Sequence, residues 1–243
     1  MRWSQIVQLA VIAAIVGAAT TAAAVLIPWL PPSASEQRDR IDFTFWLVTG
    51  ISIFIFAVVV SVILFSVLKF RARPDDDTDG PPIHGNTGLE IAWTAVPALL
   101  VTVIAVAAGV VLTQNGNAGS NPLRVNVTAV QFAWSFEYAN SSAKGVQATT
   151  LRLPLGRPVQ LELHSKDVIH SFWVTEFGQK MDALPDTPEF PHPTHLVITP
   201  SKLGTFPIIC TELCGLGHSL MRSQVIVMKP AQFDAWAKAR KQA

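Results

Sequence analysis

Long apolar stretches dominate the first half of the chain. Residues 6–30, 43–68 and 91–112 contain no Asp, Glu, Lys or Arg. Each stretch is long enough to cross a hydrocarbon core of ~30 Å, which takes about 20 helical residues. The loop between the second and third stretches is rich in turn-forming residues. We therefore expect residues 43–114 to form a two-helix transmembrane hairpin.

The first apolar stretch has two interpretations. Met1 and Arg2 precede an apolar run that ends in the small residues Ala18 to Ala24, a pattern that resembles a secretory signal with its cleavage region. The run is long for a signal, so a retained N-terminal helix is the alternative. Residues 1–30 are therefore expected to be either a signal peptide or an additional helix.

Positive charge predicts the orientation of the hairpin. Lys69, Arg71 and Arg73 directly follow the second stretch, and clustered Lys and Arg mark the cytoplasmic side of a membrane protein. The loop of residues 69–90 is then cytoplasmic. Residues 33–42 and everything after about Leu112 lie outside the cytoplasmic membrane.

The second half of the chain has the pattern of a β-rich domain. After a short polar linker at 115–122, apolar and polar residues alternate in short runs separated by Gly and Pro. These runs predict an all-β extracytoplasmic domain over residues 121–243, built as a sandwich or barrel. The expected strands are 123–130, 150–155, 159–163, 194–199 and 225–228, followed by a terminal helix at 230–241.

The composition of the chain is typical of a membrane protein and gives no support to nucleic-acid binding. Half of the residues are hydrophobic and 14% are charged, whereas about a quarter are charged in a typical soluble domain. The net charge is +1, and no basic tract carries interleaved aromatic residues. Nucleic-acid binding is therefore unsupported.

Both cysteines of the chain lie in one short segment that also holds other soft ligands. Cys210, Cys214, His218 and Met221 fall within twelve positions, and thiolate, imidazole and thioether groups together favour copper. A disulfide is the first alternative, but so local a bridge would stabilise little. Structural zinc is the second, but zinc rarely uses methionine.

A histidine upstream extends this group. His170 follows a predicted strand and lies among apolar and aromatic residues. A lone histidine there would more often be a core residue, but beside the cysteine segment it supplies a second imidazole. Two thiolates, two imidazoles and a thioether are too many for one blue-copper ion. The surplus suggests two metal ions that share both cysteines.

These motifs resemble those of subunit II of cytochrome c oxidase, and the resemblance covers most of the chain. The segment Cys-x3-Cys-x3-His-x2-Met, preceded by Asp-Val-x-His-Ser, matches the copper motif of that family. The resemblance implies a cupredoxin-like Greek-key domain that holds the binuclear copper centre CuA. It also implies a magnesium ion, bound by the Glu212 carboxylate, at the interface with subunit I. The implied copper ligands are His170, Cys210, the backbone carbonyl of Glu212, Cys214, His218 and Met221.

The family also supplies an expected function. Its members accept electrons from cytochrome c at CuA and pass them to haem in subunit I, where reduction of oxygen to water is coupled to proton pumping. The resemblance implies that this chain is an electron-transfer subunit with no turnover alone and that the haems belong to the partner. The expected partners are subunit I, other oxidase subunits, membrane lipid, and a cytochrome c that is soluble, membrane-bound or held in a supercomplex. The implied location is the bacterial plasma membrane, with several spans.

Two further segments resemble the family. Glu90 begins the second hairpin helix, where relatives have a carboxylate at the mouth of a proton channel; a favourable charge at a helix N-terminus is the alternative. The run from Gln131 to Tyr138 resembles the aromatic segment beneath the cytochrome c docking face, and a strand with a buried aromatic face is the alternative. Many relatives have tryptophan at the position of Phe132, where electrons are thought to enter; Trp134 is a second candidate for this role.

Three other classes of protein are alternatives. Nitrous-oxide reductase carries a similar copper centre, but in a much larger soluble enzyme without this hairpin. A copper-delivery protein would bind one exchangeable ion, and a structural subunit would tolerate loss of the ligands. The chain lacks a Cys-x-x-Cys-His motif, so no c-type haem is expected on it. The outer domain carries equal numbers of basic and acidic residues between 121 and 228, which is unlike a strongly acidic docking face.

Overall fold

The computed structural model describes residues 2–71, 80, 82, 84–189 and 193–242. The chain divides into two compact units, one of residues 1–30 and 43–109 and the other of residues 31–42 and 110–243. Most of the turn-rich loop predicted between the hairpin helices lies outside the described residues.

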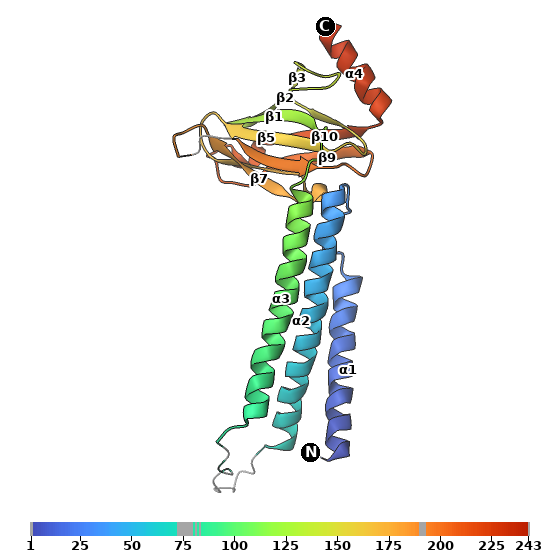
Figure 1. Cartoon of the computed structure of the whole chain (residues 1–243), viewed down its shortest axis with the longest axis vertical. Coiled ribbons are helices and arrows are strands. Elements are labelled where there is room, and N and C mark those ends of the chain that lie inside the picture. The colour runs from blue at the N-terminus through green and yellow to red at the C-terminus, as the bar shows by residue number, and fades with distance from the viewer. Residues whose placement is uncertain (1, 72–79, 81, 83, 190–192, 243) are drawn as a thin grey trace. The chain divides into compact units, whose positions relative to one another are not determined.

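Three long helices carry the apolar stretches (Figure 1). They are α1 (Trp3–Leu26), α2 (Glu36–Lys69) and α3 (Thr87–Asn115). Among the described residues, these three helices are long and apolar enough to cross a membrane. Within their unit, α1 packs along α2, and a Cβ added at Gly17 would lie 3.6 Å from the Cβ of Ala57. Many of their large apolar side chains are exposed, as expected for surfaces that face lipid or other subunits.

The helix α2 begins several residues before the predicted membrane stretch. Ion pairs at i,i+4 spacing support its polar first turns: Arg38 Nε lies 2.6 Å from Asp42 Oδ1, and Arg40 Nη2 lies 3.2 Å from Glu36 Oε2. These turns belong to the second compact unit, residues 31–42 and 110–243, which we call the β-rich unit. Within this unit, the Ser35 hydroxyl donates a hydrogen bond to the carbonyl of Phe177, at 2.9 Å.

The β-rich unit is a barrel-like arrangement of two sheets, which confirms the predicted fold class. The strands are β1 (Leu123–Val130), β2 (Ala133–Tyr138), β3 (Gln147–Ala148), β4 (Leu151–Pro154), β5 (Val159–Ser165), β6 (His170–Trp173), β7 (Lys180–Pro185), β8 (Thr194–Ile198), β9 (Gly204–Cys210) and β10 (Arg222–Met228). Neighbouring strands are hydrogen-bonded in the order β3-β2-β1-β5-β7-β6-β9-β10-β4, and β8 lies off this path, paired with β5.

Alternation along the strands builds the core between the sheets. In β1 and β5 every second side chain is buried, and these two strands pair in parallel from Leu123 with Val159 onward. Trp134, Phe136 and Tyr138 are the buried positions of β2, so the aromatic run is a strand with a buried aromatic face. The helix α4 (Pro230–Gln242) follows β10, and its Phe233 ring packs against the ring of Tyr138.

Candidate metal centre

Three neighbouring strands bring the predicted metal ligands to one end of the β-rich unit. His170 is the first residue of β6 and Cys210 the last of β9, and the two strands pair with Phe172 opposite Cys210. Met221 directly precedes β10, and its carbonyl accepts a hydrogen bond from the N–H of Cys210 at 3.3 Å. Cys214 and His218 lie on the connecting segment, residues 211–221, which we call the ligand loop.

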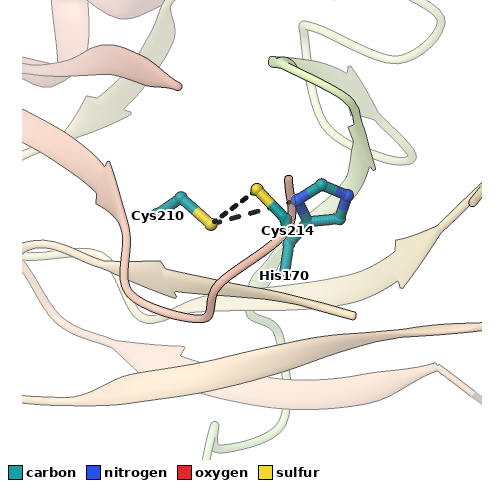
Figure 2. A group of neighbouring side chains, drawn as sticks. All are labelled: His170, Cys210 and Cys214. Carbon is teal, nitrogen blue, oxygen red and sulfur yellow. Dashed lines mark hydrogen bonds between the residues drawn. The ribbon is translucent and has the colours of Figure 1, made fainter. Parts of the chain in front are cut away.

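The two cysteines are free and buried, and their sulfur atoms face each other. The two Sγ atoms lie 3.9 Å apart. Figure 2 shows both sulfurs and the His170 ring directed toward one another. Within the described part of the chain, these three residues form the one group of His, Cys and acidic donors whose ligand atoms all lie within 4.8 Å.

The remaining soft ligands surround this pair. His170 Nδ1 lies 3.9 Å from Cys210 Sγ, and His218 Nδ1 lies 3.5 Å from Cys214 Sγ. The Met221 sulfur lies 3.9 Å from Cys214 Sγ, and the Glu212 carbonyl oxygen lies 3.3 Å from Cys210 Sγ. The structure therefore brings together all six predicted ligand groups, and their sulfur and imidazole chemistry fits copper.

Asp167 fixes the orientation of the His170 ring. Its Oδ1 lies 2.8 Å from His170 Nε2, which leaves Nδ1 to face the sulfurs. Partial burial opposes ionisation of this carboxyl. Hydrogen bonds from the Gln131 N–H, from His170, from the Val168 N–H and from the Ser165 hydroxyl outweigh it and lower the pKa of Asp167 to about 2. The carboxylate is thus held as an acceptor beside the imidazole, a common arrangement next to metal-binding histidines.

Burial also acts on the thiol of Cys214. Burial and the neighbouring Cys210 raise the pKa of the Cys214 thiol to about 11, because two thiolates so close together repel each other away from water. A bound cation reverses this preference, since coordination deprotonates a thiol. The paired cysteines are therefore electrostatically suited to a positive ion.

Phe132 and Trp134 differ in their relation to the site. The Phe132 ring is 38% exposed and lies against the ligand loop. A Cβ added at Gly217 would come within 2.5 Å of Phe132 Cδ2, so only glycine fits there. The Trp134 ring is buried at a centroid distance of 6.1 Å from the His170 ring, and its indole N–H has no hydrogen-bond partner among the described residues.

The two glutamates of interest are both exposed. Glu212 lies on the ligand loop and is exposed to solvent, and its backbone carbonyl faces the Cys210 sulfur. Glu90 lies in the first turn of α3 and accepts a hydrogen bond from the N–H of Asn86 at 3.3 Å. This contact matches the favourable helix-terminus charge considered as the alternative for Glu90. Its proton-channel role stays a prediction.

Comparison with known proteins places this architecture in a family. The family model for the transmembrane domain of cytochrome c oxidase subunit II matches residues 23–108, and that for the periplasmic domain matches residues 146–229. Cytochrome c oxidase subunit 2 of Synechocystis is 32% identical over 86% of this chain and 75% of its own length. The corresponding protein of Thermostichus vulcanus is 32% identical over 86% of this chain and 77% of its own length.

A solved structure is also similar. The periplasmic domain of subunit II of cytochrome oxidase from Bradyrhizobium japonicum covers 52% of this chain and 98% of its own, at 23% identity and a TM-score of 0.46.

The fold and the site define a membrane protein with long apolar helices, a barrel-like β domain and a cluster of Cys, His and Met suited to copper. Together with the two family matches, they show that the chain belongs to the cytochrome c oxidase subunit II family. It is a subunit of that oxidase, which implies a complex with subunit I.

Proposed function

We propose that this chain is the electron-accepting subunit of the oxidase and holds a binuclear CuA centre. The convergence of two free buried cysteines with two imidazoles, a thioether and a carbonyl carries this proposal. When bound, the copper pair would take one electron from cytochrome c and pass it to haem in subunit I, where oxygen is reduced to water and protons are pumped.

The ligands divide between the two ends of the sulfur pair. Cys210 and Cys214 would hold both ions as thiolates, and each sulfur has a different imidazole beside it. His170 would bind one ion and His218 the other. Met221 and the Glu212 carbonyl are suited to weak outer positions, because a thioether and a neutral carbonyl are poorer donors than a thiolate.

The protein holds four of the six donor residues in a rigid environment shielded from water. His170 and Met221 are fully buried, and Cys210 and Cys214 are nearly so. Strand pairing fixes the backbone of His170 opposite Ala183 and that of Cys210 opposite Phe172, and the Met221 carbonyl accepts a hydrogen bond from the Cys210 N–H. A site whose ligands are fixed by the fold reorganises little when its charge changes, and the polarity and hydrogen bonding around its sulfurs set the potential.

The remaining functional assignments belong to the same proposal. Phe132 would receive electrons from cytochrome c, because its ring is exposed and also touches the ligand loop; buried Trp134 is the second candidate. The Glu212 carboxylate would bind magnesium at the interface with subunit I, and Glu90 would stand at the mouth of a proton channel. The β-rich unit would lie outside the bacterial plasma membrane.

Copper content and electron paramagnetic resonance test the proposal. The full-length chain, purified in detergent and loaded with copper, should hold two ions and show hyperfine splitting from two equivalent copper nuclei that share one unpaired electron. A single ion with a mononuclear spectrum would indicate a copper-delivery protein. Zinc bound in preference to copper would also reject the proposal.

Substitution of a bridging ligand separates this role from a structural one. In the assembled oxidase, Cys210→Ser should abolish oxidation of cytochrome c, because a hydroxyl cannot replace a bridging thiolate. The amount of assembled complex, measured by immunoblot after native gel electrophoresis, is the control. Normal oxidation by a fully assembled Cys210→Ser complex would mean that the chain is only structural.

A further inference from the structure

Gln131 contacts the metal centre without belonging to the group of converging donors. It lies in the turn between β1 and β2, far from the ligand loop in the sequence. Its side-chain amide donates a hydrogen bond to the backbone carbonyl of Cys214. Its backbone N–H donates a second hydrogen bond to Oδ2 of Asp167, at 2.7 Å.

The second of these contacts leads directly to another ligand. The other oxygen of the same carboxylate, Oδ1 of Asp167, lies 2.8 Å from His170 Nε2. Gln131 is therefore connected through one hydrogen bond to the peptide of Cys214 and through two to the ring of His170. These two predicted ligands come from different segments of the chain, and Gln131 links them.

Glycine in the ligand loop makes the first contact possible. Gly215 follows Cys214 and has a φ of +129°, a conformation that side chains rarely adopt. A Cβ added there would lie 2.8 Å from Gln131 Nε2 and 3.2 Å from Phe132 Cζ. The amide reaches the Cys214 carbonyl only because this position has no side chain.

We propose that Gln131 is a positioning residue of the metal centre. Its amide holds the Cys214 peptide, and its backbone N–H holds the carboxylate that orients His170; it binds no metal itself. This inference rests on the proposed copper centre. Loss of a hydrogen-bond partner behind a ligand typically weakens metal binding about 10–100-fold. Without the amide, the Cys214 carbonyl loses its hydrogen bond from the β1–β2 turn.

Two substitutions remove the amide donor in different ways. Gln131→Leu keeps approximately the volume of the side chain but cannot donate a hydrogen bond. Gln131→Glu keeps the shape and sets an acceptor against the Cys214 carbonyl, which is unfavourable. Both retain the backbone N–H that binds Asp167. Gln147→Leu is the matched control, because Gln147 is exposed on β3, away from the ligand loop.

The rate of copper release measures the effect. Full-length variants in detergent are loaded with copper and mixed with excess chelator, and loss of the copper absorption band is followed with time. We expect release to be about tenfold faster or more in both Gln131 variants, with altered copper hyperfine splitting. We expect no change in Gln147→Leu. A Gln131 variant that folds by circular dichroism but takes up no copper would support the same role.

The outcomes separate this inference from the proposed function. Wild-type release rates and unchanged spectra in the Gln131 variants would overturn the positioning role, as would equally fast release in Gln147→Leu. If one of these two variants does not fold, the other decides the test. Gln131→Asn is a third test variant: it keeps the amide donor but shortens its reach to the Cys214 carbonyl, so we expect faster copper release from it as well. A wild-type chain that never holds a copper pair contradicts the proposed function instead.

Discussion

At the scale of single residues, Phe132 joins the molecular surface to the ligand loop. Its ring is partly exposed and packs against Gly215 and Gly217. Truncation of an aromatic residue that anchors a docking surface costs about 2 kcal/mol or more of binding. We therefore predict that Phe132→Ala lowers the second-order rate of cytochrome c oxidation by roughly tenfold or more. Stopped-flow mixing of the assembled oxidase with reduced cytochrome c measures this rate.

An exposed apolar residue away from the site is the matched control for Phe132. Leu203 is 43% exposed and lies just before β9, whose far end carries Cys210. Leu203→Ala should leave the rate unchanged, and copper content should stay normal in both variants. Equal rates for Phe132→Ala and the wild type, with the copper retained, would contradict the role of Phe132.

The candidate ligands are visible in the sequence, whereas the contacts that support them are not. Cys210, Cys214, His218 and Met221 share one short segment, so their chemistry is visible from spacing alone. Gln131 lies 83 residues from Cys214, and no local pattern distinguishes it from any other glutamine in a turn. Its role depends on tertiary packing, which brings the β1–β2 turn against the ligand loop.

At the scale of elements, the first turns of α2 pack against the short turn after β6. Arg38 is 5% exposed and donates a hydrogen bond to the carbonyl of Thr175 at 2.9 Å. Gly178 has a φ of +79°, and a Cβ added there would lie 2.5 Å from Arg38 Cδ. Gly178→Ala should therefore destabilise the β-rich unit by about 2–5 kcal/mol, the sum of left-handed strain and overpacking.

A second glycine separates backbone strain from the contact with Arg38. Gly156 has a similar φ of +74°, but a Cβ added there meets nothing within 4 Å. Gly156→Ala should cost only about 1–2 kcal/mol, the strain alone. Guanidinium unfolding of the full chain in detergent, followed by tryptophan fluorescence, gives both values. Equal losses in the two variants would show that the contact between α2 and Gly178 contributes nothing.

Some elements follow from local pattern and others only from pairing. The alternation of residues 123–130 predicts β1 with the bounds that the structure has. β9 contains Gly204 and Pro207, both of which disfavour strands, and it forms because β6 and β10 pair with it on either side. The start of α2 was missed because its charged turns interrupt the apolar pattern; i,i+4 pairs and burial of Arg38 stabilise them.

At the scale of the whole molecule, the division into apolar helices and a β-rich unit was predictable, but not its boundary. The prediction began the outer domain at residue 121, whereas residues 31–42 and 110–120 also belong to that compact unit. Hydropathy cannot reveal this, because Gln37 and Arg38 are polar residues that are buried through long-range contacts. The N–H of Thr199, for example, donates a hydrogen bond to Gln37 Oε1 at 2.7 Å.

The single tyrosine of the chain reports on the stability of the β-rich unit as a whole. Tyr138 is buried where β2 meets α4, and its hydroxyl donates to the carbonyl of Arg152 and accepts from the N–H of Arg152, both at 2.8 Å. The Trp236 ring lies 5.3 Å from its own ring. Burial raises the pKa of Tyr138 well above its usual value of about 10, although its contacts with Arg152 oppose the shift.

This shift predicts how stability depends on alkaline pH. Because the folded state retains the Tyr138 proton more strongly than the unfolded state, the stabilisation is complete below about pH 10 and declines as pH rises toward the folded pKa. One proton changes the free energy of unfolding by about 1.4 kcal/mol per pH unit. Tyrosinate absorbance should therefore appear together with unfolding, as followed by circular dichroism. Tyr138→Phe should lose this component of the pH dependence, whereas ionisation near pH 10 in a folded chain would contradict the burial of the hydroxyl.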